Sequence, residues 1–212
     1  MSKTALVIGA TGLVGAELVR QLLESPHYDR VITLGRRVLP LQHAKLQQEI
    51  FDFDHPDAAK VHGDDLFCAM GTTLAKAGSK EAQYKIDCTY PVEVGKIARA
   101  NGVKRYLLVS SIGADARSGN FYLRTKGDLE ETIAGLGFEA FVSARPSFLL
   151  GDRQEFRLGE KIGIVLVQAF RLLTPKKYRG IQAAQVAAVL IAWANREFSG
   201  IQYLESDVLQ DY

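Results

Sequence analysis

The chain has 212 residues, 47% hydrophobic and 24% charged, a balance typical of a globular domain that buries a sizeable core. Its formal net charge is only +2 and its Lys and Arg residues are scattered, so the sequence lacks the basic stripe that binds a nucleic-acid backbone. No apolar run approaches the roughly 20 residues that span a bilayer, and the N-terminal apolar run is too short for a signal peptide. We therefore expect a cytoplasmic protein that binds neither nucleic acid nor membrane.

Short β-branched runs alternate with segments of helical period, a pattern that predicts βα units and a parallel sheet with helices on both faces. The predicted strands are 5–8, 31–34, 45–51, 65–69, 105–110 and 139–143. The predicted helices are 13–24, 90–101 and 122–135, followed by helical patterns at 158–173 and 181–195 and a last strand at 202–205. The expected fold is α/β: a doubly wound, Rossmann-like single domain over residues 1–212 with a short C-terminal extension.

The first predicted strand runs into a GxxGxxG spacing that also opens the first predicted helix. At such a junction the first glycine permits a tight turn, the second lets the backbone approach a pyrophosphate, and the third lets helix and strand pack closely. Backbone N–H groups and the positive end of the helix dipole favour a bound anion there. The residues predicted to hold a dinucleotide at this turn are Gly9, Thr11, Gly12, Leu13, Val14 and Gly15.

Arg36 and Arg37 follow the second predicted strand, where a protein that prefers NAD carries an Asp or Glu for the ribose hydroxyls. Two guanidinium groups would instead bind the 2′-phosphate of NADP, so we predict NADP(H) as the cofactor. A pair of arginines that contacts only solvent is the alternative. Ligands bind beyond the carboxyl ends of parallel strands. By that position alone we add four residues after the third and fourth strands: Asp52, Phe53, Gly71 and Thr72.

Tyr122 and Lys126 lie four residues apart and share one face of a predicted helix. A phenol exchanges a proton near neutral pH only when a neighbouring cation such as Lys126 favours its ionised form, and Lys126 could also bond the nicotinamide ribose. Ser110 and Ser111 end the fifth predicted strand just before this helix, and we favour Ser111 as the hydroxyl that holds a substrate carbonyl. The alternative is a surface tyrosine with a long lysine, and serines that merely end a strand.

Cys68 and Cys88 fall in segments predicted to be buried, and we interpret them as reduced core residues, with Cys68 in a cofactor pocket as the alternative. The four histidines lack metal-ligand spacing, so no metal site is expected. The apolar face over 162–170 fits a core position better than a dimer surface, which leaves a homodimer open.

A GxxGxxG turn followed by Ser, Tyr and Lys in that order resembles the short-chain dehydrogenase/reductase superfamily, and the atypical single-domain branch fits best. More narrowly, the segments 67–73, 76–78, 110–115, 122–127 and 145–155 are similar to bacterial relatives of the human Tat-interacting protein family of NADPH-binding oxidoreductase-like proteins. The resemblance implies a Rossmann fold with bound NADPH and Pro146 near the nicotinamide. It also implies Ser111, Tyr122 and Lys126 as the catalytic set.

The leading hypothesis is an NADP(H)-dependent oxidoreductase that moves a hydride between the nicotinamide and an unidentified small carbonyl or alcohol substrate. An NADPH-sensing regulatory protein with little or no turnover is the rival, because few residues after Pro146 are left to build a substrate pocket. A nucleotide-sugar epimerase or dehydratase is a third hypothesis. Such enzymes usually carry a larger C-terminal substrate domain, which argues against it.

Overall fold

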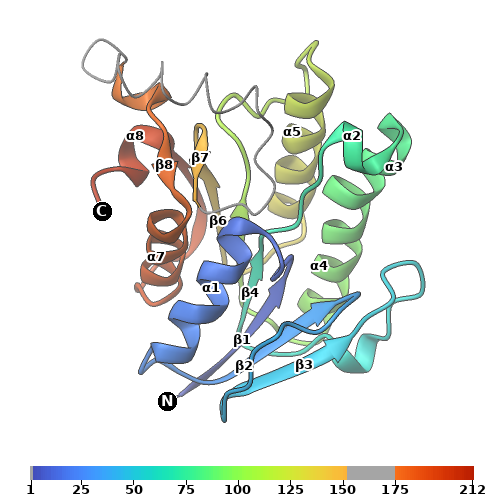
Figure 1. Cartoon of the computed structure of the whole chain (residues 1–212), viewed down its shortest axis with the longest axis vertical. Helices are drawn as coiled ribbons and strands as arrows, with labels where there is room; N and C mark the ends of the chain where they lie inside the picture. The colour runs from blue at the N-terminus through green and yellow to red at the C-terminus, as the bar shows by residue number, and fades with distance from the viewer. Residues whose placement is uncertain (1, 152–174) are drawn as a thin grey trace.

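Seven parallel strands form one sheet in the order β3-β2-β1-β4-β5-β6-β9 (Figure 1). The computed structural model describes residues 2–151 and 175–212. The strands are β1 Lys3–Ile8, β2 Tyr28–Gly35, β3 Leu46–Ile50, β4 Asp65–Cys68, β5 Arg105–Val109, β6 Ala140–Arg145 and β9 Gly200–Glu205. A separate short parallel pair joins β7 Leu149–Leu150 to β8 Ile181–Gln182. The predicted strands are confirmed, and the strand predicted at 202–205 is the edge strand β9.

The helices fall between the strands, as the alternating pattern predicts. They are α1 Leu13–Glu24, α2 Leu74–Ala77, α3 Lys80–Tyr84, α4 Tyr90–Ala100, α5 Phe121–Ala134, α7 Ala183–Ala194 and α8 Ser206–Leu209, with short turns η1 Ala58–Lys60, η2 Lys85–Thr89 and η3 Lys176–Tyr178. The predicted helix 158–173 and the apolar face at 162–170 lie outside the described residues. No helix in the described part of the chain is long and apolar enough to cross a bilayer.

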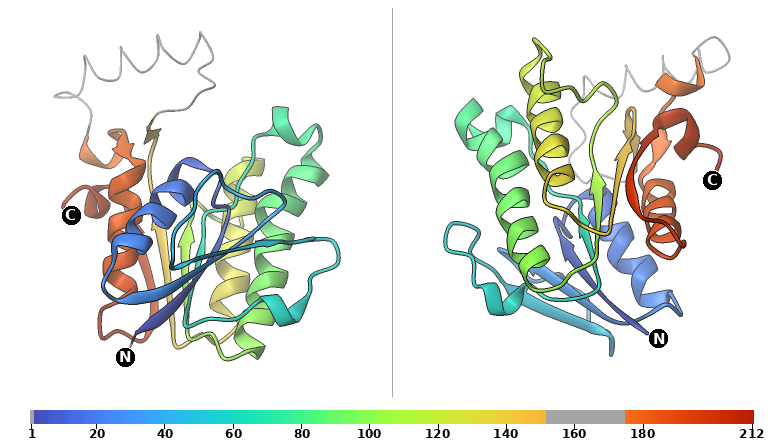
Figure 2. Two further views of the ribbon diagram at one scale, coloured as in Figure 1. Left: turned by 60° about the horizontal axis from the view of Figure 1, so that its bottom comes forward. Right: turned by 180° about the vertical axis from the view of Figure 1, so that it is seen from behind.

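Helices cover both faces of the sheet, with α1 and α7 on one side and α4 and α5 on the other (Figure 2). Alternate residues of the central strand β1 serve the two layers because side chains of a strand point alternately to opposite faces. Ala5 and Val7 belong to the core beneath α1 and α7, whereas Leu6 and Ile8 belong to the core beneath α4 and α5. Both Cys68 and Cys88 are buried free thiols in the second of these cores, as predicted.

The helix predicted to begin at Tyr90 begins ten residues earlier, because α3, η2 and α4 follow one another without interruption. The middle segment η2 is a π-helical turn that ends just before Pro91. Pro91 has no N–H, and in a regular α-helix its ring would clash with the carbonyl four residues earlier, that of Asp87. A wider turn relieves this clash. It also turns the consecutive residues Asp87 and Cys88 into the interior, where both are buried.

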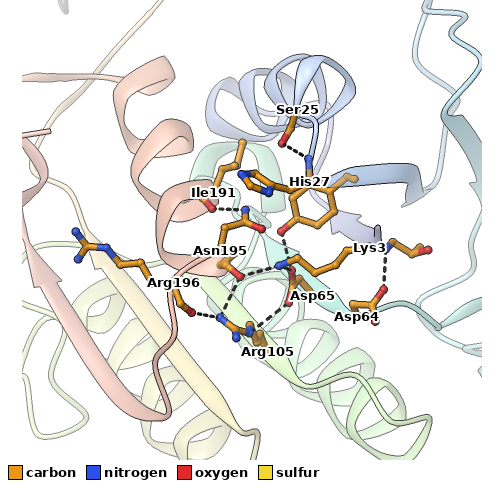
Figure 3. A network of polar contacts seen from close by, with 12 residues as sticks. Lys3, Ser25, His27, Asp64, Asp65, Arg105, Ile191, Asn195 and Arg196 are labelled. Carbon is orange, nitrogen blue, oxygen red and sulfur yellow. Dashed lines mark hydrogen bonds and ion pairs between the residues drawn. The ribbon is translucent and has the colours of Figure 1, made fainter. Parts of the chain in front are cut away.

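A polar network closes the end of the sheet where the strands begin (Figure 3). The carboxylate of Asp65, which is only 1% exposed, accepts hydrogen bonds from Lys3 Nζ at 2.7 Å and from Tyr28 Oη at 2.6 Å. Lys3 and Arg105 also donate to the carbonyl of Ala194 at the end of α7. Four strands and a helix are thereby tied together at the edge opposite the predicted ligand site.

Candidate functional site

The carboxyl ends of the parallel strands meet at one edge, and the predicted site residues follow those ends. The strand order reverses between β1 and β4, since the chain runs outward from β1 through β2 to β3 and then returns to β4 beside β1. Ligands of doubly wound sheets bind in the crevice at such a switch point. The structure therefore places the glycine turn after β1 where the fold most favours a ligand.

Gly9 packs directly against the backbone of Ala69, which follows the neighbouring strand β4. Its φ is +82°, a conformation that disfavours every residue with a side chain. A Cβ built on Gly9 would lie 2.4 Å from the carbonyl carbon of Ala69, just beyond β4. Only glycine fits here, so the turn lies directly against the backbone that follows the neighbouring strand.

Gly12 and Gly15 have different structural reasons to be glycine. A Cβ on Gly15 would lie 2.1 Å from the carbonyl oxygen of Gly9, so the first turn of α1 packs on the end of β1 at backbone distance. Gly12 is exposed and caps α1 without any side-chain hydrogen bond, and its own Cβ would have no contact closer than 3.3 Å. The N–H groups of Leu13 and Val14 have no carbonyl within the helix to bond, so they can receive an anion.

Arg36 and Arg37 are exposed just after β2, and neither forms an ion pair within the described residues. Asp52 is also exposed, and hydrogen bonds from the Asp54 N–H and from His55 hold its pKa below the usual carboxyl value. The ring of Phe53 is different, since it is only 8% exposed and packs between Phe51 and Tyr90. At this point of the edge Asp52, rather than the Phe53 ring, is the side chain that faces solvent.

Lys126 is the most buried of the predicted catalytic residues. It is 3% exposed on α5, and its Nζ donates to the carbonyl of Met70 at 3.4 Å, just beyond β4. Tyr122, one helical turn earlier, is 37% exposed. The structure thus brings the lysine to the same stretch of backbone that contacts Gly9, while the tyrosine remains open to solvent.

The loop after β5 carries the two serines and packs tightly against α5. A Cβ on Gly127 would lie 2.1 Å from the N atom of Ala116, so the absence of a side chain directly after Lys126 permits this approach. The Ser111 hydroxyl is half-buried and donates to the Ile112 carbonyl at 3.3 Å. The Ser110 hydroxyl is buried and has no hydrogen-bond partner within the described residues. Both serines therefore remain candidates for the catalytic hydroxyl, with Ser111 the more accessible.

The end of β6 joins the same edge through Pro146. Its carbonyl accepts the N–H of Ile112 at 2.9 Å, and the ring itself is buried. This hydrogen bond holds the predicted nicotinamide neighbour Pro146 beside the loop that carries Ser111.

Asp87 lies beside the predicted site, although no pattern in the sequence pointed to it. Its Oδ1 accepts the N–H of Thr72 at 2.7 Å, and it is fully buried behind the predicted residues Gly71 and Thr72. The local signal is an acidic residue four positions before a proline in a helical stretch. That spacing predicts a local disturbance of the helix, although not the direction in which the carboxylate turns.

A glycine turn at the switch point of a parallel sheet, with a buried lysine reaching the same stretch of backbone, defines a Rossmann-like fold of the dinucleotide-binding class. A family model described as NAD(P)H-binding matches residues 9–197, and the chain belongs to this family.

Several curated relatives are fungal proteins. The mitochondrial protein Fmp52 of Emericella nidulans is 38% identical over 171 residues, which cover 76% of this chain and 73% of that protein. Its counterpart in Aspergillus clavatus is 36% identical over 219 residues, covering 98% and 91% of the two chains. Among solved structures, MoeE5 in complex with UDP-glucose and NAD is similar, with a TM-score of 0.74 and 18% identity over 95% of this chain and 75% of MoeE5.

These relatives correct two predictions. They are fungal Fmp52 proteins rather than the Tat-interacting protein family that the motifs suggested, whereas the NAD(P)H-binding family and the Rossmann-like fold that the resemblance implies are confirmed. Their names describe mitochondrial proteins, so the predicted cytoplasmic location is wrong. That prediction was based on the absence of a bilayer-spanning or signal-peptide run, which does not distinguish between compartments inside a cell.

Proposed function

We propose that the protein is an NADP(H)-dependent oxidoreductase acting on a small carbonyl or alcohol. The observation that carries the proposal is the position of Lys126, a buried ammonium group held on the backbone after β4. The same backbone contacts the glycine turn through Gly9. A bound dinucleotide with its pyrophosphate on α1 would extend along this edge toward the lysine.

The residues fit the cofactor. Gly12 leaves the first turn of α1 open to an anion because it carries no capping side chain. Arg36 and Arg37 supply two exposed guanidinium groups at the end of β2, where a 2′-phosphate would lie, and this supports NADP(H) over NAD(H). NADPH, when bound, would supply the hydride.

Side chains of this protein would donate the proton that the reduction requires. Tyr122 would donate a proton to the carbonyl oxygen during reduction, and Lys126 would favour the tyrosinate that remains. Ser111 would hold the carbonyl oxygen in place by hydrogen bonding. The exposure of Tyr122 leaves its hydroxyl accessible to a substrate from outside.

Turnover and binding must be measured separately to test this proposal. Purified protein is titrated with NADPH and NADH by fluorescence, and NADPH oxidation is followed with a panel of small aldehydes and ketones. Tyr122→Phe should lose at least about a hundredfold in turnover, the usual contribution of a general acid, with NADPH affinity unchanged. Unaltered turnover in this variant would refute the assigned role.

The second candidate is a protein that binds NADPH to fix a conformation and has little turnover. One observation favours it: the uncapped first turn of α1 and the exposed Arg36 and Arg37 would bind NADPH whether or not a substrate reacts. NADPH binding without oxidation across the whole carbonyl panel would favour this candidate. A nucleotide-sugar enzyme is a third candidate, because the fold is shared with MoeE5, whose structure contains UDP-glucose, although a quarter of MoeE5 lies outside the matched region.

A further inference from the structure

The carboxylate of Asp87 is buried and only partly satisfied. Oδ1 accepts the Thr72 N–H at 2.7 Å, but Oδ2 has no hydrogen-bond partner within the described residues. A buried carboxylate oxygen without a hydrogen-bond partner destabilises the folded state, because it loses its hydration and forms no hydrogen bond in return. A nearby positive charge would offset this cost, and so would a functional role for the carboxylate.

Lys126 is a buried cation that lacks a carboxylate partner among the described residues. Its ammonium group is buried, has a single long hydrogen bond to the Met70 carbonyl, and forms no ion pair in the described part of the chain. A neutral carbonyl stabilises an ammonium group less than a carboxylate does. The lysine therefore also needs a counter-charge.

The two groups flank the same backbone position. A Cβ built on Gly71 would lie 3.8 Å from Lys126 Nζ and 3.9 Å from Asp87 Oδ1. The ammonium and the carboxylate therefore lie around one residue without a side chain, just beyond the end of β4, and the charge of Lys126 acts on Asp87. Both groups are buried, and opposite charges in one neighbourhood attract more strongly when burial removes the water around them.

We propose that Asp87 is the counter-charge and positioning residue of Lys126. The π-helical turn before Pro91 directs the carboxylate inward, Thr72 anchors one oxygen, and the charge holds the ammonium group at the edge beside Gly71. This assignment rests on the proposed function, because the position held is the one from which Lys126 would serve Tyr122 and the cofactor ribose.

The other groups near Asp87 do not compete for this role. The thiols of Cys68 on β4 and Cys88 on η2 face it, and burial raises the pKa of both, so they are neutral near pH 7. Gln83 on α3 contributes an uncharged amide. Within the described residues Lys126 on α5 is the cation that acts on Asp87.

The first test measures the interaction in the protein without cofactor. Burial raises the pKa of Asp87 and the nearby Lys126 charge lowers it, so Lys126→Met should raise that pKa further. Carboxyl carbon NMR of Asp87 during a pH titration reads this directly. Lys85→Met is the matched control: Lys85 is only two residues from Asp87 but pairs with Asp54 at 2.5 Å, so the titration should not move.

An Asp87 titration that is the same in Lys126→Met as in the wild type would overturn the proposal. So would an Asp87 that is protonated at neutral pH in the wild type. Neither result depends on NADPH or on turnover, so the inference can fail while the proposed function stands.

The second test uses the cofactor and the reaction. Asp87→Asn preserves the acceptor for Thr72 but removes the charge, and should lower kcat by about tenfold to a hundredfold, the effect of a displaced catalytic group. The double variant with Lys126→Met should be no worse than Lys126→Met alone, because both substitutions remove the same interaction. NADPH affinity should show the same non-additivity.

Glu130→Gln serves as the matched control for loss of a buried carboxylate. Glu130 lies one turn beyond Lys126 on α5 and pairs with Arg145 at 2.6 Å, so kcat should be unchanged. Additive losses in the double variant would overturn the positioning role. A wild type that does not bind NADPH would instead refute the proposed function and leave the charge interaction measured by NMR intact.

Discussion

Gly15→Ala should damage the fold of the glycine turn itself. The new Cβ would lie 2.1 Å from the Gly9 carbonyl oxygen and 2.9 Å from the Ala10 Cα, and both are backbone atoms that cannot rotate away. Ordinary contact begins near 3.4 Å, so α1 must shift by roughly 1 Å relative to β1. Overpacking of this kind costs about 1–3 kcal/mol of unfolding free energy.

Gly12→Ala should separate cofactor binding from stability. Gly12 has φ −82° and ψ 170°, which any residue adopts, and the nearest atom to its new Cβ would be 3.3 Å away. The change in unfolding free energy should stay within about 1 kcal/mol, the difference between Gly and Ala at a helix N-cap. The methyl group would occupy the place where a pyrophosphate approaches the backbone, so NADPH affinity should fall at least tenfold, about 1.4 kcal/mol.

Urea unfolding gives the stability of each variant and fluorescence titration gives the NADPH dissociation constant. Gly119→Ala is the control, since its Cβ would meet nothing within 4 Å and its φ is not positive, so both quantities should match the wild type. Gly12→Ala with wild-type NADPH affinity would refute the placement of the pyrophosphate. Equal destabilisation by Gly12→Ala and Gly15→Ala would refute the packing argument.

Three further predictions test other parts of the molecule. Asp65→Ala removes the acceptor that Lys3 and the buried Tyr28 hydroxyl share (Figure 3). The variant should lose about 3 kcal/mol of unfolding free energy in urea, the lower end for a broken buried pair, because Lys3 keeps its hydrogen bond to Ala194. A loss below about 1 kcal/mol would contradict this reasoning. Arg36→Ala should weaken NADPH binding about tenfold or more and leave NADH binding unchanged, and equal affinity of the wild type for both cofactors would overturn the NADP assignment. Burial raises the pKa of Asp87 in the folded state, so the native protein binds more protons than the unfolded chain just above pH 3.8. As pH rises through that window, the wild type should therefore lose stability relative to Asp87→Asn. A stability difference that does not change with pH would contradict the raised pKa.

Local patterns predicted the architecture because each depends on neighbouring residues. The alternation of strand and helix, the first helix at 13–24 and the glycine turn all follow from periodicity and from the special backbone of glycine. The prediction began the helix at residue 90, where Pro91 would stand in its first turn as prolines often do, whereas the helix in fact runs on from Lys80 through a π-helical turn. The sequence signals an irregular turn at such a proline but does not determine which kind forms.

The sequence by itself determined that this chain is a parallel α/β fold with a dinucleotide turn, because spacing within a few residues carries that information. Only the tertiary structure decided that the Phe53 ring belongs to the core and that Gly127 lets α5 touch the loop after β5. It alone brought Asp87 and Lys126 together around Gly71. These contacts join residues tens of positions apart in the chain, and they exist because the order of the strands, rather than any local pattern, sets which strand ends are neighbours.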